Sequence, residues 1–162
     1  MHKAALIHGV IDDYGLDVLA LSETWITSDA PPAVKNAVAP NGFNVLHVHR
    51  EIVPDGRARG GRLAILHRDS IPVLAFDLVG APRPTTYERQ MVRIVAPSSS
   101  SVVVANIYRP PSAPISSYID ELDDLLGNII SDSNNKILLR GDFNCPGLDE
   151  THIGLLTVLE SY

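Results

Sequence analysis

Two apolar runs separated by an amphipathic segment place the strongest constraint on how this chain folds. Residues 102–108 are rich in β-branched side chains and predict a buried strand. Residues 137–139 are three consecutive apolar residues, a pattern typical of a strand buried on both faces. The segment between them predicts a helix through apolar residues at helical spacing, namely Ile119, Leu122, Leu125, Leu126, Ile129 and Ile130. A helix between two buried strands indicates a layered α/β fold.

The rest of the chain adds further strands and a helix at each end. Apolar spacing predicts a first helix over residues 6–14, stopped by Gly15, and a last helix from about Asp149 to Leu159. Further strands are expected at residues 18–21, 43–48, 62–67, 73–78 and 87–95. This cluster of strands predicts a mixed sheet, or two sheets packed face to face between helices.

Composition narrows the class of protein. The chain has 162 residues, 45% of them hydrophobic and 20% charged, which fits one folded domain. It has no apolar run of the roughly 20 residues that a membrane-spanning helix needs, and no signal-peptide pattern. Its single cysteine, Cys145, excludes an internal disulfide and favours a reducing compartment. The formal charge of −6 is not that of a generally basic DNA-binding protein, so nucleic-acid contacts would be local.

Three of the predicted strands end in polar side chains. Glu23 follows the first strand, Tyr108 ends the β-branched strand, and Asp142 and Asn144 follow the last one. If these strands lie side by side in the same sense, the four side chains gather at one sheet edge, where ligands of α/β proteins bind. A Glu and an Asp without a basic partner suit a hard cation such as Mg²⁺, and Tyr108 and Asn144 could hydrogen-bond a phosphate.

Spacing alone leaves structural explanations open for each of these residues. Glu23 fits a solvated strand end or a helix cap, and Asp142 with Asn144 fits an Asx turn. Tyr108 fits a packing residue ahead of a polyproline turn.

Taken together, the motifs resemble a known family. Three segments resemble motifs of the endonuclease/exonuclease/phosphatase superfamily, in the same order and at similar separations: Leu21-Ser22-Glu23-Thr24-Trp25, Tyr108-Arg109-Pro110-Pro111 and Gly141-Asp142-Phe143-Asn144. A fourth block of the family is similar to Arg59-Gly60-Gly61 with the apolar residues 63–66. The tryptophan and the arginine-proline pair resemble the endonuclease domain of non-LTR (LINE-type) retrotransposons more than apurinic/apyrimidinic repair enzymes.

The resemblance implies a four-layered α/β sandwich, with two mixed sheets packed between helices, and Mg²⁺-dependent cleavage of a phosphodiester by an activated water. Glu23 would bind the metal, and Asp142 would activate the water or protonate the leaving oxygen. Tyr108, Asn144 and Arg109 would bind the substrate phosphate, with Tyr108 and Asn144 also taking part in catalysis. The implied partners are DNA and a reverse transcriptase in a longer polyprotein, and the implied location is the nucleus.

The chain also departs from the family pattern. The family begins with a strand carrying an asparagine and ends with an aspartate and a Ser-Asp-His motif, and neither part is found among residues 1–162. We therefore expect a single partial domain with little or no nuclease activity. None of the six histidines matches the family's catalytic histidine. Arg57, Arg59 and Arg62 could contact a DNA backbone or lie in a solvated loop.

Two other functions stay open. One is a phosphoesterase of the same fold that acts on inositol phosphates or phospholipid headgroups. The other is a truncated remnant with no enzymatic activity.

Overall fold

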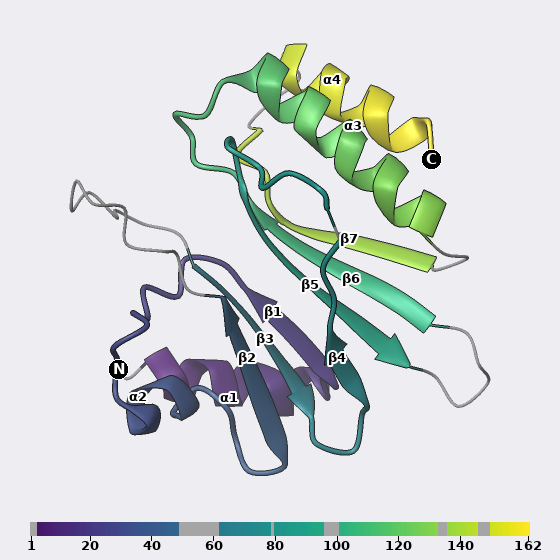
Figure 1. The fold of residues 1–162 in the computed structure, drawn as a ribbon. Helices are drawn as coiled ribbons and strands as arrows, with labels where there is room; N and C mark the ends of the chain where they lie inside the picture. The colour runs from purple at the N-terminus through teal and green to yellow at the C-terminus, as the bar shows by residue number, and fades with distance from the viewer. Residues whose placement is uncertain (1–2, 49–61, 79, 96–100, 133–135, 146–149) are drawn as a thin grey trace.

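The computed structural model describes residues 3–48, 62–78, 80–95, 101–132, 136–145 and 150–162 (Figure 1). The described helices are α1 (Lys3–Tyr14), α2 (Pro32–Asn36), α3 (Ile115–Asp132) and α4 (Glu150–Glu160). The described strands are β1 (Val18–Leu21), β2 (Phe43–Val48), β3 (Leu63–Arg68), β4 (Val73–Ala75), β5 (Glu88–Val95), β6 (Ser101–Tyr108) and β7 (Lys136–Asp142). None of the described helices is long and apolar enough to cross a bilayer.

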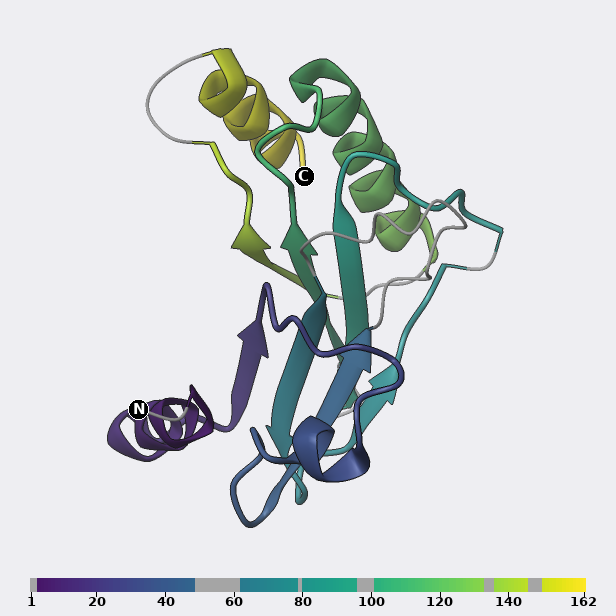
Figure 2. The ribbon, with the colours of Figure 1, turned by 90° about the vertical axis from the view of Figure 1, so that its left-hand side faces the viewer.

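The elements form four layers. One sheet has the strand order β1-β3-β2 and is antiparallel, and the other has the order β4-β5-β6-β7 and is mixed. The two sheets pack against each other, with α1 and α2 beside the first and α3 and α4 over the outer face of the second (Figures 1 and 2). The predicted four-layered α/β sandwich is confirmed, with the first sheet antiparallel and only the second mixed among the described strands.

Strand β6 is the centre of the core because it is buried on both faces. Val104 packs between the sheets in a cluster with Ala20, Ile65 and Val92. The alternate residues Val103, Ala105 and Ile107 belong to a second cluster beneath α3 and α4. The helix α3 contributes to that cluster the stripe that its sequence predicts, except that Ile130 is 44% exposed and Tyr118 is fully buried in its place.

Strand β7 corrects one expectation. Ile137 and Leu139 pack against the cluster beneath the helices, but Leu138 is 55% exposed. The prediction of a strand buried on both faces is therefore wrong at this position. β7 ends the sheet order and only its helix-facing side is covered, which a run of apolar residues does not reveal.

Helix α1 is less buried than its stripe predicts. Of the predicted apolar stripe, Ile11 is 1% exposed, whereas Leu6, Val10 and Tyr14 are 52%, 41% and 75% exposed. The helix does end where the sequence indicates, at Gly15, whose φ of +57° favours glycine.

The three strands that end in polar residues do not share one sheet. β6 and β7 are parallel neighbours, as expected, with Tyr108 opposite Asp142. β1 belongs to the other sheet, where it pairs with β3. The residues that follow β1 therefore meet the ends of β6 and β7 across the space between the two sheets, rather than along a single sheet edge.

Candidate active site

The side chains singled out in the sequence come together at the ends of β1, β6 and β7. The Tyr108 hydroxyl donates a hydrogen bond to Oε1 of Glu23, which joins the two sheets. Asp142 is the register partner of Tyr108 on β7. The main-chain N–H of Asn144 donates to Oδ1 of Asp142 at 3.1 Å, which is the Asx-type contact that the spacing allows. Tyr108 is 6% exposed, whereas the Glu23 and Asp142 side chains are exposed to solvent.

Two buried amides hold the sheets in this arrangement. Asn106 is fully buried and its Nδ2 donates to the carbonyl oxygen of Leu21 at 3.0 Å, at the end of β1. Its register neighbour Gln90 is 4% exposed, and its Nε2 donates to the carbonyl oxygen of Leu46 on β2 at 2.8 Å. Because Leu21 lies two residues before Glu23, Asn106 is a positioning residue for that carboxylate. The sequence feature that could have pointed to Asn106 is its position as a single polar residue inside a β-branched run.

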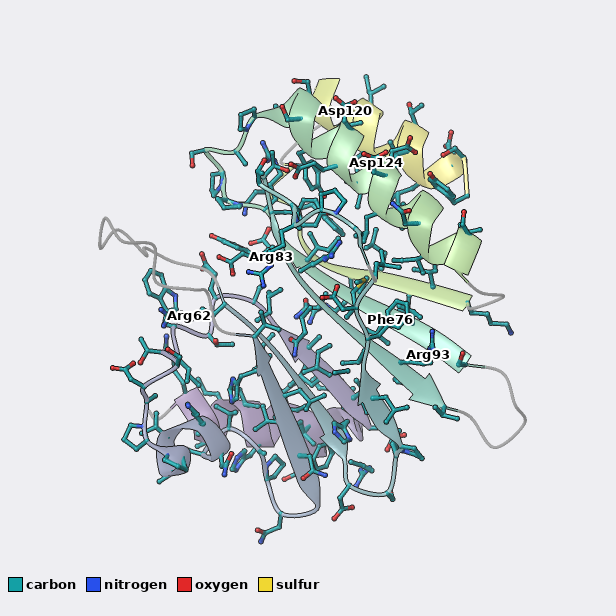
Figure 3. All side chains as sticks on the ribbon, in the orientation of Figure 1. Arg62, Phe76, Arg83, Arg93, Asp120 and Asp124 are labelled. Carbon is teal, nitrogen blue, oxygen red and sulfur yellow. The ribbon has the colours of Figure 1, made fainter. Side chains whose placement is uncertain are left out.

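The backbone beyond β1 is held in an uncommon conformation. Glu23 and Trp25 both have φ of +56°, where bulky side chains are rare. The N–H of Thr24 donates to the carbonyl oxygen of Arg62 at 3.1 Å, and Nη1 of Arg62 reaches the carbonyl oxygen of Trp25 at 3.5 Å. The N–H of Arg62 in turn donates to Oε2 of Glu88 on β5 at 2.5 Å. Arg62, labelled in Figure 3, thus links the turn after β1 to the second sheet.

Arg62 is 9% exposed, so its side chain does not lie in a solvated loop, and its contact to a DNA backbone stays a prediction. Arg57 and Arg59 lie outside the described residues, as does the block Arg59-Gly60-Gly61.

Gly141 allows β7 to approach β6 closely. It pairs with Ile107 and has φ of +148°. A Cβ added there would overlap the carbonyl oxygen of Ile107 and lie 2.7 Å from its carbonyl carbon. Glycine is therefore required for the register that places Asp142 opposite Tyr108.

Arg109 stabilises the turn that follows β7 through hydrogen bonds. It is 3% exposed, and its guanidinium donates to the carbonyl oxygens of Asn144 at 3.0 Å, Phe143 at 3.4 Å and Ala113 at 2.6 Å. Nδ2 of Asn144 donates back to the carbonyl oxygen of Arg109 at 2.6 Å. These contacts give Arg109 a positioning role in this structure. The phosphate contact expected from the family resemblance stays a prediction.

Burial and negative charge keep Tyr108 protonated. Burial raises the pKa of its hydroxyl to about 12, helped by the hydrogen bond to Glu23 and by the charges of Glu23, Asp142 and Glu88. At neutral pH the hydroxyl is therefore a hydrogen-bond donor. The same carboxylates concentrate negative charge at this edge, which favours a bound cation.

The donor set suits a hydrated hard cation rather than a metal enclosed by protein. No group of three or more His, Cys, Asp and Glu side chains is arranged to hold a metal within the described parts of the chain. Mg²⁺ commonly binds through one or two carboxylates and keeps several waters. The exposed carboxylate of Glu23, with Asp142 nearby on β7, fits that mode of binding.

Three histidine rings in the described part of the chain contact main-chain oxygens. The rings of His8, His47 and His67 contact the main-chain oxygens of Ala37, Lys35 and Arg68, at 3.2, 2.9 and 2.9 Å. His2 and His49 lie outside the described residues, and so does the side chain of His152.

A groove of about 600 Å³ borders the site on the β5 side. Its lining includes Glu88 and Pro110, close to Tyr108, and the cationic side chains of Arg83 and Arg89. Arg83 is labelled in Figure 3.

Comparison with known proteins identifies the family. The sequence model of the endonuclease/exonuclease/phosphatase family matches residues 1–157, so the chain belongs to this family. No curated protein matches the chain.

Solved structures of the family share the fold at low sequence identity. The AP endonuclease LMAP from Leishmania major superimposes with a TM-score of 0.73 at 12% identity, covering 98% of this chain and 61% of that one. TDP2 from D. rerio, complexed with a single-strand DNA product, gives 0.57 at 15% identity, covering 96% and 56%. ANGEL2, a 2′,3′-cyclic phosphatase, gives 0.60 at 20% identity, covering 90% and 44%. This chain thus spans 44–61% of the length of these three relatives.

Proposed function

We propose that this chain is the phosphodiester-cleaving domain of a Mg²⁺-dependent endonuclease that nicks DNA. The observation that carries the proposal is the hydrogen bond from Tyr108 to Glu23, with Asp142 in register beside Tyr108. Through these two contacts, two carboxylates and a protonated phenol carried by two different sheets lie close together. That combination suits a cation and a phosphate bound side by side.

Each residue has a proposed role in the reaction. Mg²⁺, when bound, supplies a positive charge that polarises the phosphate and stabilises the charge that develops on it. Glu23 holds the cation through its exposed carboxylate. Tyr108 has one O–H, which donates to Glu23 in this structure. With substrate bound, this O–H turns from Glu23 to a phosphate oxygen, and Asn144 orients the phosphate. Asp142 accepts the proton of the attacking water or returns one to the leaving oxygen.

The resemblance to LINE-type endonucleases supports a narrower proposal. In it, the domain cuts a chromosomal target site next to a reverse transcriptase carried on the same polyprotein, in the nucleus. Two solved relatives are described as an AP endonuclease and as a protein complexed with a DNA product, which agrees with DNA as the substrate class.

A phosphoesterase acting on small phosphate esters is the alternative. One solved relative is described as a 2′,3′-cyclic phosphatase, so the family fold also serves non-endonucleolytic chemistry. Inositol phosphates and phospholipid headgroups are the substrates that this alternative would add.

Metal-dependent DNA binding tests the proposal without requiring catalysis. We expect Mg²⁺ to tighten binding of a labelled DNA duplex by about tenfold over EDTA at constant ionic strength, since a bridging cation offsets repulsion between Glu23 and the phosphate. Glu23→Gln should abolish this difference, as measured by fluorescence anisotropy. Asp13→Asn removes the same charge from the exposed side of α1 and should leave the Mg²⁺ effect unchanged.

Two outcomes would contradict the proposal. One is an equal Mg²⁺ effect in wild type and Glu23→Gln. The other is displacement of the DNA by inositol trisphosphate at lower concentration than by unlabelled DNA, which would favour the small-ester alternative.

Plasmid nicking by this chain is expected to be weak, since a general acid–base group contributes about 10²–10⁴-fold and no described histidine lies at the site.

A further inference from the structure

We propose that Trp25 is a stacking platform for a nucleobase of the strand that is cut. The proposal rests on the proposed function, because it requires a nucleic-acid substrate. It assigns a binding role to a residue two positions beyond the metal-binding carboxylate of Glu23.

Core packing does not explain why the Trp25 side chain is exposed to solvent. Its side chain is 59% exposed, and it is the single tryptophan of the chain. Isolated exposed apolar residues are common on protein surfaces and need no explanation by themselves. The way in which the backbone holds this residue sets it apart from the others.

The backbone of Trp25 is held in a strained conformation by contacts on both sides. Its φ of +56° is unfavourable for a bulky residue, and such strain is typically retained at functional sites. Hydrogen bonds from Thr24 to Arg62 and from Arg62 to the Trp25 carbonyl oxygen fix the turn. Because Arg62 is itself buried and its N–H is bonded to Glu88, the main chain that carries the exposed indole is tied to the second sheet.

The charge of the site makes a stacking contact useful. The chain has a formal charge of −6, and the negative charges of Glu23, Asp142 and Glu88 all raise the pKa of Tyr108. A polyanion therefore gains little general electrostatic attraction here. Stacking on an aromatic ring supplies affinity that depends on the base rather than on phosphate charge.

The location relates the stacked base to the reacting phosphate. Two residues of chain span at most about 7 Å, so the Cα atoms of Glu23 and Trp25 lie within about one nucleotide's length of each other. Inositol phosphates and common phospholipid headgroups have no aromatic face to stack. An indole at this position therefore also favours nucleic acid over the small-ester alternative.

The single tryptophan gives a direct readout of the proposed contact. Two single-stranded oligonucleotides of equal length and charge are compared in Mg²⁺, one with all bases and one with three central abasic sites. We expect the first to quench Trp25 fluorescence on binding and the second to bind without quenching. In anisotropy measurements Trp25→Ala should bind the complete oligonucleotide about tenfold more weakly and the abasic one as wild type does.

Two further variants sharpen the comparison. Trp25→Phe keeps an aromatic face and should recover most of the affinity. Tyr14→Ala removes another exposed aromatic ring, 75% exposed on α1, and should change neither affinity.

The outcomes separate this proposal from the proposed function. Binding of both oligonucleotides with equal quenching, or an unchanged affinity of Trp25→Ala for the complete one, overturns stacking while leaving DNA binding in place. Failure of the wild-type protein to bind either oligonucleotide overturns the proposed function and the stacking contact with it.

Discussion

Replacing Gly141 with alanine is expected to lower the free energy of unfolding by about 3 kcal/mol or more, as measured by urea denaturation. The added Cβ would overlap the carbonyl oxygen of Ile107, which is main chain and cannot rotate away. The φ of +148° adds a conformational penalty for any residue other than glycine. β7 would have to move away from β6, which would displace Asp142 from its place opposite Tyr108.

Gly9→Ala is the matched control for this substitution. Gly9 lies inside α1 and a Cβ there would meet no atom within 4 Å. Alanine at that position should be neutral or stabilise the protein by about 0.5–1 kcal/mol, because it favours a helix. A Gly141→Ala variant as stable as the wild type would show that β7 does not pair with β6 in this register.

Removing the guanidinium of Arg109 is expected to cost about 3 kcal/mol of stability, again by urea denaturation. Arg109→Leu keeps an apolar stem but leaves the carbonyl oxygens of Ala113, Phe143 and Asn144 without their donor. Arg109→Lys should recover only part of the loss, because an ammonium cannot reproduce the planar fork of donors.

Arg68→Lys provides the control for the arginine substitution. Arg68 forms a surface ion pair with Asp17 at 2.5 Å, and both side chains are largely exposed. Such pairs are worth about 0–1 kcal/mol, so this variant should differ little from wild type. If Arg109→Lys proved as stable as wild type, the bracing role would be wrong, and a direct phosphate contact would become the better explanation of Arg109.

The sequence predicted the parts of this fold whose signal is local. β6 and α3 follow from β-branched and helical periodicity, and Glu23, Tyr108, Asp142 and Asn144 lie where their strands end. It did not predict that β1 belongs to the other sheet. Four apolar residues show that a strand is buried but carry no information about its partner. The convergence of the site therefore depends on sheet packing that only the structure reveals.

The residues that sequence reasoning missed act through the main chain. Asn106 and Gln90 each use an amide to hold a carbonyl oxygen of the opposite sheet. Arg62 bonds the carbonyl oxygen of Trp25 through its side chain and Glu88 of the second sheet through its main-chain N–H. Such contacts depend on where a distant backbone oxygen lies. Residue type and spacing therefore reveal little beyond a polar residue in an apolar run.

We propose that Glu23, Tyr108 and Asp142 surround a cation-binding site formed between the two sheets. Paramagnetic broadening of backbone amide NMR signals by substoichiometric Mn²⁺, which shares the oxygen ligands of Mg²⁺, tests it most directly. We predict that the signals of these three residues broaden first, and that Glu23→Gln removes the effect. Broadening centred elsewhere, or unchanged in Glu23→Gln, would mean that the cation does not bind at these residues.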